Sequence, residues 1–140
     1  MFNTIPYGCL RLLWWIRTKL IMYTYNIEVL RVIDGDTIDA SIDLGFDVKI
    51  KKRIRFMGIN TPESRTRDLE EKKRGLAAKQ RVAELLDTAT EVQVISHGVG
   101  KFGRCLGEID FCCPDSLTMK NLNKTLIEEG HAVEYHGGKR

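Results

Sequence analysis

The chain has 140 residues, with 22 Lys and Arg against 19 Asp and Glu, which gives a formal net charge of +3. This length suits one domain with a hydrophobic core of its own. With 43% hydrophobic and 29% charged residues, the composition excludes collagen-like, low-complexity and wholly disordered chains. No apolar run in the sequence reaches the ~20 residues that a membrane-spanning helix needs.

The first 21 residues differ in character from the rest of the chain. They contain three basic residues and no acidic one, so residues 22–140 carry 19 basic and 19 acidic groups. Overall charge therefore gives no support for nucleic-acid binding, which only a local cluster of basic residues can provide. Two interpretations of residues 1–21 stay open: a membrane-surface segment, or translation upstream of a natural start at Met22, which we favour. We expect residues 22–140 to form the folded domain, with membrane contact only if residues 1–21 are native.

The cysteines form no CxxC pair and have no histidine at ligand spacing. They are Cys9, Cys105, Cys112 and Cys113. We expect reduced thiols rather than disulfides or a zinc site, which favours a cytoplasmic protein. We also expect a monomer, since no feature of the sequence implies a protein partner.

The predicted elements begin with three strands. Residues 25–33 are rich in β-branched and aromatic residues and run into an Asp-Gly-Asp turn. Residues 37–44 and 47–57 then alternate between apolar and polar side chains. This period of two is typical of half-buried antiparallel strands.

A helix is predicted over residues 66–87, where apolar residues return at helical spacing. The residues expected on its buried face are Leu69, Leu76, Val82, Ala83 and Leu86. Two more strands, residues 91–96 and 104–111, follow and are joined by a glycine-rich loop. Thr118 is predicted to cap a last helix that ends at Gly130. Its expected buried residues are Met119, Leu122, Leu126 and Ile127.

This order of elements predicts an α+β, mostly β, fold. Five strands interrupted by one helix are what a small closed barrel of the oligonucleotide-binding type requires. One helix would then lie between the third and fourth strands and the other at the C-terminal end.

Polar residues gather in three short motifs. In VIDGDT (residues 32–37), Gly35 permits a tight turn that directs Asp34 and Asp36 towards one centre. The others are RFMGINTPE, residues 55–63, and KFGR, residues 101–104. Taken alone, the three motifs are more typical of a hairpin turn, a turn before a helix and a flexible loop.

Together, however, the motifs supply the groups that phosphodiester hydrolysis needs. Arg55 and Arg104 offer fork-shaped donors to the nonbridging phosphate oxygens. A carboxylate such as Asp36, combined with a backbone carbonyl, suits a hard divalent cation such as calcium. A further carboxylate, Glu63, can act as the base that activates water.

These motifs resemble those of the staphylococcal nuclease (thermonuclease) family. In that family a strand ends in a DGDT-type turn, an arginine stands five residues before a (D/N)-(T/A)-P-E block, and a glycine-rich loop ends in (Y/F)GR. Here Arg55 and Asn60 have the spacing of the second motif, and Phe102-Gly103-Arg104 matches the third. The resemblance runs from about Ile27 to Tyr135. Three motifs in order are specific, although each alone is weak.

The resemblance implies a calcium-dependent hydrolase, an endo- or exonuclease of the thermonuclease type. Its substrates would be single-stranded or frayed DNA and RNA, cut with little sequence specificity to leave 5′-hydroxyl and 3′-phosphate ends. By the same resemblance, Arg55 and Arg104 hold the phosphate and stabilise the transition state, and Glu63 is the general base. The implied calcium ligands are Asp36, Asn60 and the Thr61 carbonyl; the implied nucleotide contacts are Lys101 and Phe102; Asp34 and Thr37 support the turn.

Asn60 departs from the family pattern, since the best-studied members have a second aspartate there. An amide oxygen still coordinates calcium, but one negative charge fewer should lower the affinity. The departure favours an alternative hypothesis, a barrel that binds single-stranded nucleic acid without cutting it. A third hypothesis, a protein-interaction module tethered by the apolar leader, has no motif in its favour.

A cluster of basic residues occupies the third predicted strand and the loop beyond it. Its members are Lys49, Lys51, Lys52, Arg53, Arg55, Arg65 and Arg67. Two interpretations are equally supported: a solvated strand face, or a stripe that follows a nucleic-acid backbone.

Overall fold

Alternation of apolar and polar side chains produces three antiparallel strands at the start of the folded part of the chain. In a computed structural model, which describes residues 23–100 and 102–136, these are β1 (Thr24–Asp34), β2 (Thr37–Asp43) and β3 (Lys49–Phe56). β2 pairs with β1 on one side and with β3 on the other. The prediction for residues 1–21 lies outside the described residues.

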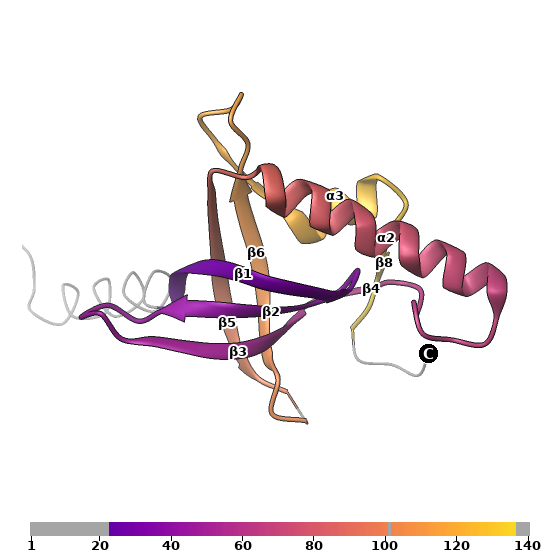
Figure 1. Ribbon diagram of the computed structural model, residues 1–140, viewed down its shortest axis with the longest axis horizontal. Helices are drawn as coiled ribbons and strands as arrows, with labels where there is room; N and C mark the ends of the chain where they lie inside the picture. Colours follow the sequence, from indigo (N-terminus) through magenta and orange to yellow (C-terminus); the bar gives the residue numbers. More distant parts are fainter. Residues whose placement is uncertain (1–22, 101, 137–140) are drawn as a thin grey trace, which may run out of the picture.

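Two further strands close these three into a barrel. β5 (Glu91–Val99) pairs antiparallel with β1 and with β6 (Cys105–Cys112), and β6 pairs in parallel with β3. The resulting cycle of hydrogen-bonded strands is β3-β2-β1-β5-β6 and back to β3. In Figure 1, β5 and β6 cross the other three strands at a steep angle. The predicted five-stranded barrel is confirmed.

Three short strands were not predicted, because two or three residues give no usable periodicity. β4 (Ile59–Asn60) pairs with β8 (Val133–Glu134) as a separate two-stranded sheet. β7 (Met119–Asn121) extends the barrel sheet beyond β6. The β4–β8 pair brings the C-terminal segment against the residues that follow β3.

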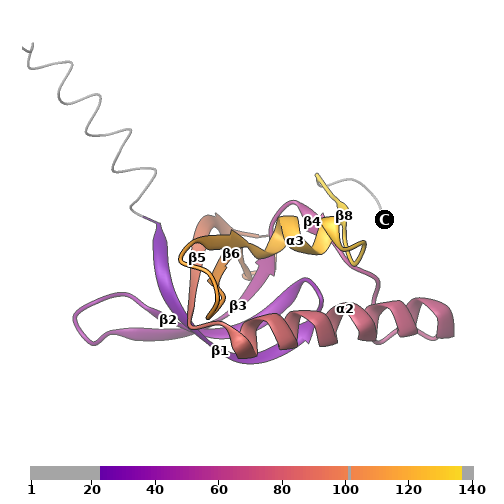
Figure 2. The same ribbon diagram turned by 90° about the horizontal axis from the view of Figure 1, so that it is seen from above.

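Helix α2 (Leu69–Thr88) lies between β4 and β5 in the chain and along one side of the barrel (Figures 1 and 2). It begins later than predicted because the Asp68 side chain accepts hydrogen bonds from the backbone N–H groups of the first turn. The predicted buried face is wrong in part, since Leu69 is 78% exposed and Leu76 is 45% exposed. The predicted Ala83 is exposed as well. The buried residues of the helix are Gly75, Ala78, Val82 and Leu86, of which Val82 and Leu86 were predicted.

Helix α3 (Leu122–Glu128) is shorter than predicted. Its N-cap is Asn121, whose side chain accepts a hydrogen bond from the Lys124 backbone N–H at 3.0 Å, so the prediction of Thr118 as the cap is wrong. The residues before it form β7 because they pair with β6. The helix ends as predicted at Gly130, which has a φ of +81° and donates its backbone N–H to the Ile127 carbonyl.

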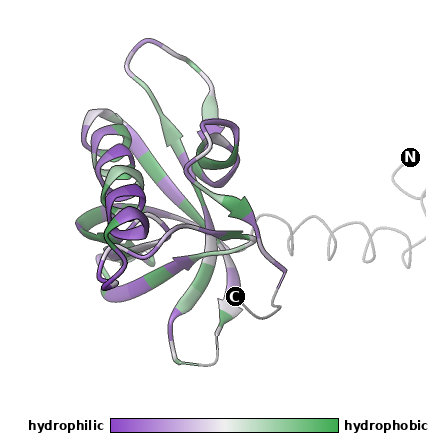
Figure 3. Cartoon of the chain, turned by 90° about the vertical axis from the view of Figure 1, so that its right-hand side faces the viewer, coloured by the Kyte–Doolittle hydropathy of each residue, from purple (hydrophilic) through white to green (hydrophobic). Residues whose placement is uncertain are grey.

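The hydrophobic core fills the barrel and the space beneath α3. Its largest fully buried side chains are Phe56, Phe111, Ile38, Ile54, Ile59, Ile109, Leu122, Leu126 and Val82. The β2–β3 hairpin projects beyond this core (Figure 2), which leaves Leu44, Phe46 and Val48 exposed. Figure 3 shows that hydrophilic residues predominate along α2. Of the helices in the described part of the chain, none is long and apolar enough to cross a membrane.

Candidate nuclease site

Residues from all three sequence motifs line one cleft at the mouth of the barrel. The cleft has a volume of about 530 Å³. Its lining residues are Asp34, Asp36, Thr37, Arg55, Thr61, Pro62, Glu63, Arg65, Phe102, Arg104 and Tyr135. The tertiary structure therefore brings together most of the residues that the sequence predicted for one site.

Asp36 is held at the turn between β1 and β2 by contacts on both sides. Its backbone carbonyl accepts a hydrogen bond from the Phe56 N–H at 2.8 Å, which ties the turn to the end of β3. One carboxylate oxygen accepts from the Thr37 hydroxyl at 3.0 Å, and the other accepts from the Thr61 backbone N–H at 3.2 Å. Asp36 is only 5% exposed, so its carboxylate makes these contacts in the interior of the protein.

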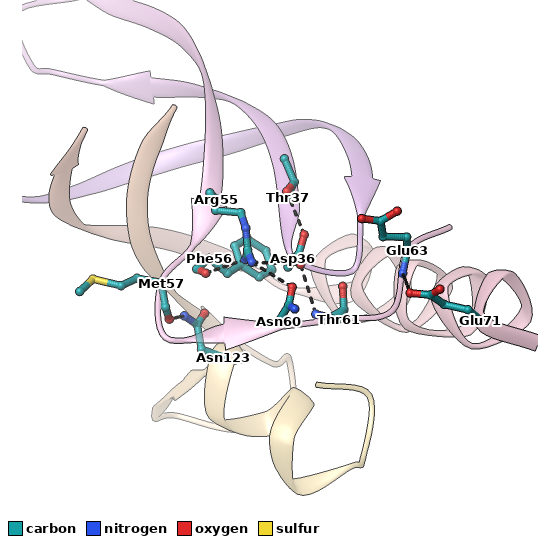
Figure 4. Close-up of polar contacts among 10 residues, drawn as sticks. All are labelled: Asp36, Thr37, Arg55, Phe56, Met57, Asn60, Thr61, Glu63, Glu71 and Asn123. Atoms are coloured by element: carbon teal, nitrogen blue, oxygen red, sulfur yellow. Dashed lines mark hydrogen bonds and ion pairs between the residues drawn. The ribbon is translucent and has the colours of Figure 1, made fainter. Parts of the chain in front are cut away.

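Arg55 lies between the two side chains that were predicted as metal ligands (Figure 4). Its Nη2 is 3.3 Å from Oδ2 of Asp36 and 3.2 Å from Oδ1 of Asn60. Its Nη1 donates to the Phe56 carbonyl at 2.9 Å. Asn60 lies just outside the main cleft and lines the neighbouring hollow beside β8. The guanidinium is thus oriented by one charged acceptor, the Asp36 carboxylate, and by two neutral acceptors, the Asn60 amide oxygen and the Phe56 carbonyl.

Glu63 occupies an exposed position in the loop between β4 and α2. Its backbone N–H donates to the Glu71 carboxylate at 3.4 Å (Figure 4), and a Ser64 hydroxyl hydrogen bond to Asp34 connects the next residue to the β1–β2 turn. Gly75 of α2 packs against this loop, since a Cβ added at Gly75 would lie 2.5 Å from the Glu63 carbonyl oxygen. The loop is therefore fixed from the helix side and from the turn side.

Phe102 and Arg104 reach the cleft from the loop between β5 and β6. The Arg104 guanidinium carbon lies 5.6 Å from the centre of the Phe102 ring, within the range of a cation–π contact. Phe102 is 82% exposed, which leaves a face of the ring open to a ligand. Lys101, the other predicted nucleotide contact, lies outside the described residues.

Tyr135 was not predicted, although it lines the cleft. It follows β8, and its backbone N–H donates to the Gly58 carbonyl at 2.9 Å, which anchors it beside the β3–β4 turn. No local pattern marks Tyr135, because its place depends on the β4–β8 pairing between distant segments.

The predicted calcium ligands form a donor set of hard oxygens. Asp36 and Asn60 direct a carboxylate and an amide oxygen to the same Arg55 nitrogen, so the two oxygens lie near each other and the Arg55 guanidinium occupies the point between them. Only one of these donors carries a negative charge, and oxygen donors of this type suit calcium. Across residues 23–100 and 102–136, no group of three or more His, Cys, Asp or Glu side chains is placed to hold a metal ion. Carboxylate, amide and backbone oxygens are the ligands that hard cations prefer.

Comparison with known proteins agrees with this geometry. A family model described as staphylococcal nuclease homologue matches residues 53–140. The chain is 34% identical over 111 residues to micrococcal nuclease of Shigella flexneri, which covers 77% of this chain and 57% of that protein. It is 30% identical over 115 residues to protein ParB of Escherichia coli, which covers 79% of this chain and 58% of that protein. A closed barrel with this cleft defines a nuclease-like fold, and the chain belongs to the staphylococcal nuclease family.

The chain spans between half and two thirds of the length of these curated relatives. The family match begins within β3 and includes Arg55, Asn60, Thr61, Glu63, Phe102 and Arg104. Asp36 and the rest of the β1–β2 turn precede the matched residues and join the site through the three-dimensional fold.

Proposed function

We propose that the protein hydrolyses phosphodiester bonds of DNA and RNA at the cleft formed by the three motifs. The observation that carries the proposal is the presence of two arginines and an exposed carboxylate, Arg55, Arg104 and Glu63, around one cleft. A binding protein needs basic residues, but it has no need of a positioned base. The similarity to micrococcal nuclease of Shigella flexneri supports the same conclusion.

Arg55 and Arg104 are the groups that bind the scissile phosphate. Each guanidinium can donate two parallel hydrogen bonds to nonbridging oxygens, and their positive charge opposes the negative charge that builds up in the transition state. Contacts with Asp36, Asn60 and the Phe56 carbonyl hold Arg55 in place before substrate binds. Pre-orientation lowers the cost of assembling the transition state.

Glu63 is the base that accepts a proton from the attacking water. The oxygen of that water bonds to phosphorus while the bond from phosphorus to the 5′ oxygen breaks. The departing 5′ oxygen takes a proton from solvent, which leaves a 5′-hydroxyl and a 3′-phosphate. A carboxylate at an exposed position of the cleft wall can reach a water molecule beside the bound phosphate. Phe102 and Tyr135 offer aromatic faces on which an unpaired base can stack.

Calcium is the proposed cofactor, and Asp36, Asn60 and the Thr61 carbonyl would hold it. When bound, a hard cation neutralises charge on the phosphate and polarises phosphorus. In its absence the Asp36 carboxylate is balanced by Arg55 alone among the ion pairs of the described residues.

The proposal is tested by measuring release of acid-soluble nucleotides from single-stranded DNA and from RNA by the full chain. Each substrate is incubated with calcium, with magnesium and with a chelator. Glu63→Gln should lower turnover by ~10²–10⁴-fold if Glu63 is the base. Glu70→Gln is the matched control, because Glu70 is exposed on the first turn of α2 and lies outside the cleft.

Calcium-dependent release that Glu63→Gln abolishes and Glu70→Gln preserves would support the proposal. A folded chain that binds oligonucleotides and releases no nucleotide from either substrate would favour the alternative, a nuclease-like barrel that binds without cutting. The substitution of Asn60 for a second carboxylate would then be the first feature to test.

A further inference from the structure

A second groove, which we call the basic groove, adjoins the candidate site on the outside of the barrel. It has a volume of about 720 Å³. It is lined by Leu30, Arg31, Asp39, Lys51, Lys52, Arg53, Phe102, Gly103 and Arg104. Phe102 and Arg104 also line the catalytic cleft, so the two hollows are continuous through these residues.

The basic residues of β3 that line the basic groove lie on the same strand as Arg55, the proposed phosphate-binding residue. Along β3, Arg55, Arg53 and Lys51 alternate with inward residues and so share one face, two residues apart. Across the sheet, Asp39 of β2 is opposite Arg53 of β3 and opposite Arg31 of β1. A row of cationic side chains therefore leads away from the catalytic cleft along the direction of β3.

The charge of the basic groove is strongly positive. Its lining contains five basic side chains and one carboxylate, that of Asp39. Hydrogen bonds from Arg53, at 2.8 and 3.2 Å, hold the pKa of Asp39 below its usual value, so this carboxylate is ionised and already paired. Within the part of the chain that the structure describes, neither Lys51 nor Lys52 forms an ion pair with an acidic side chain.

The junction between the two hollows carries an aromatic surface. Phe102 is 82% exposed and stands between the basic groove and the catalytic cleft. Exposed aromatic rings beside a line of cations are the recurring arrangement for single strands, in which bases stack and phosphates contact the basic residues. An acidic peptide would use the charges but would gain nothing specific from the ring.

We propose that a single nucleic-acid strand continues from the catalytic cleft across Phe102 into the basic groove, where Lys51 and Arg31 contact its backbone phosphates. This inference rests on the proposed function, because it extends the substrate site of the same cleft. It assigns a role to the basic strand beyond Arg55 and makes binding dependent on the length of the strand.

The test is the affinity of the full chain for labelled oligothymidylates of about four and about 16 nucleotides, the range of site sizes of such barrels. Fluorescence anisotropy is measured in the Glu63→Gln background, which keeps the oligonucleotides intact. Arg31→Ala/Lys51→Ala is compared with Lys120→Ala/Lys124→Ala, which removes the same charge from β7 and α3, outside both hollows. The Arg53–Asp39 ion pair remains in both variants, and thermal melting verifies that each is folded.

We expect Arg31→Ala/Lys51→Ala to weaken binding of the longer oligonucleotide by about 10- to 30-fold at ~0.1 M salt. The slope of log Kd against log salt should fall by about 1.4, because each contact of a single strand contributes about 0.7. The four-nucleotide probe should lose less than threefold, since the catalytic cleft accommodates it. Polyglutamate at equal charge should displace the longer probe only at a higher concentration than unlabelled oligothymidylate, because it has no bases to stack on Phe102.

Equal losses in the two double variants, or an unchanged salt slope, would overturn the proposal. Displacement by polyglutamate at the same concentration as unlabelled oligothymidylate would also overturn it, because the groove would then respond to charge alone. Failure of the proposed function is a separate outcome: it would appear as absence of hydrolysis by the chain with Glu63 intact, whereas failure of the basic groove appears only in these affinities.

Discussion

Gly75 of helix α2 lies directly against the backbone of Glu63, the proposed base. An added Cβ at Gly75 would lie 2.5 Å from the Glu63 carbonyl oxygen and 2.7 Å from the Ser64 nitrogen. Real Cβ atoms do not approach backbone so closely, so the loop or the helix would have to move. The position of the base in the cleft therefore depends on the absence of a side chain on the neighbouring helix.

Gly75→Ala should consequently impair turnover although Gly75 does not line the cleft. Alanine favours the helix by about 1 kcal/mol over glycine, but the overlap with the loop costs about 1–3 kcal/mol. A shift of the base by about 1 Å is enough to lower turnover by about 10²-fold. Steady-state hydrolysis and thermal melting check the two effects. Leu76→Ala, at a position 45% exposed, is the control that should keep full activity.

The two arginines should respond differently to removal. Arg55→Ala and Arg104→Ala should each cost roughly 3–4 kcal/mol of transition-state stabilisation, by analogy with removal of an oxyanion donor. Arg55→Ala should also lower the free energy of unfolding by about 3 kcal/mol, because it leaves the Asp36 carboxylate buried without its partner. Urea unfolding and kinetics separate these effects. Wild-type turnover in either variant would show that its arginine is structural only.

Asn60→Asp should strengthen calcium binding. The Asn60 side-chain oxygen already converges with the Asp36 carboxylate on Arg55, at 3.2 and 3.3 Å, so an aspartate there adds a charge where the ligands meet. The additional charge also offsets the positive guanidinium beside the ion. Calorimetric titration with calcium measures the affinity of both proteins. Equal affinities would place the metal elsewhere.

Asn123→Leu should destabilise the fold and disturb the site indirectly. The Asn123 side chain is 3% exposed, donates to the Met57 carbonyl at 2.7 Å and accepts from the Ile109 N–H at 3.4 Å. These contacts fix α3 to β6 and to the turn that leads from β3 to β4 (Figure 4). The Ile109 N–H and the Met57 carbonyl would lose these partners, and the buried Ile109 N–H alone should cost about 1–3 kcal/mol. Urea unfolding measures the loss, and Asn121→Ala, which removes the helix cap alone, should cost only ~1 kcal/mol.

The ion pair between Arg81 and Glu129 should make stability depend on pH. Arg81 donates two hydrogen bonds to the Glu129 carboxylate, at 2.8 and 2.7 Å, which hold the pKa of Glu129 below its ordinary value of 4.5. The pair therefore stabilises the folded chain above that pH and is lost as the pH falls through the lowered pKa. Glu129→Gln should cost about 0.5–1 kcal/mol at pH 7, since the side chains are about one-third exposed. The difference from the parent in urea unfolding should shrink towards about pH 3. A difference that is constant with pH would exclude the ion pair as its source.

Local sequence patterns were sufficient to predict the barrel and most of the residues that line the candidate site. The alternation of Ile38, Ala40 and Ile42 with polar residues determined which face of β2 is buried, because side chains of a strand alternate strictly. The three motifs likewise indicated the chemistry that we propose, since arginine, carboxylate and amide groups have fixed donor and acceptor properties.

Only the tertiary structure decided which faces pack closely and which distant residues meet. Periodicity placed Leu69 and Leu76 on the buried face of α2, but both are exposed. Gly75 packs instead against the backbone of Glu63 and Ser64, and Ala78 faces Gly35 in the β1–β2 turn. The short β4–β8 pairing positions Tyr135 at the cleft, although nothing in its own neighbourhood of the chain indicates this. Hydropathy of a segment reports how much surface it can bury, whereas the shape of the partner decides which residues fit against it.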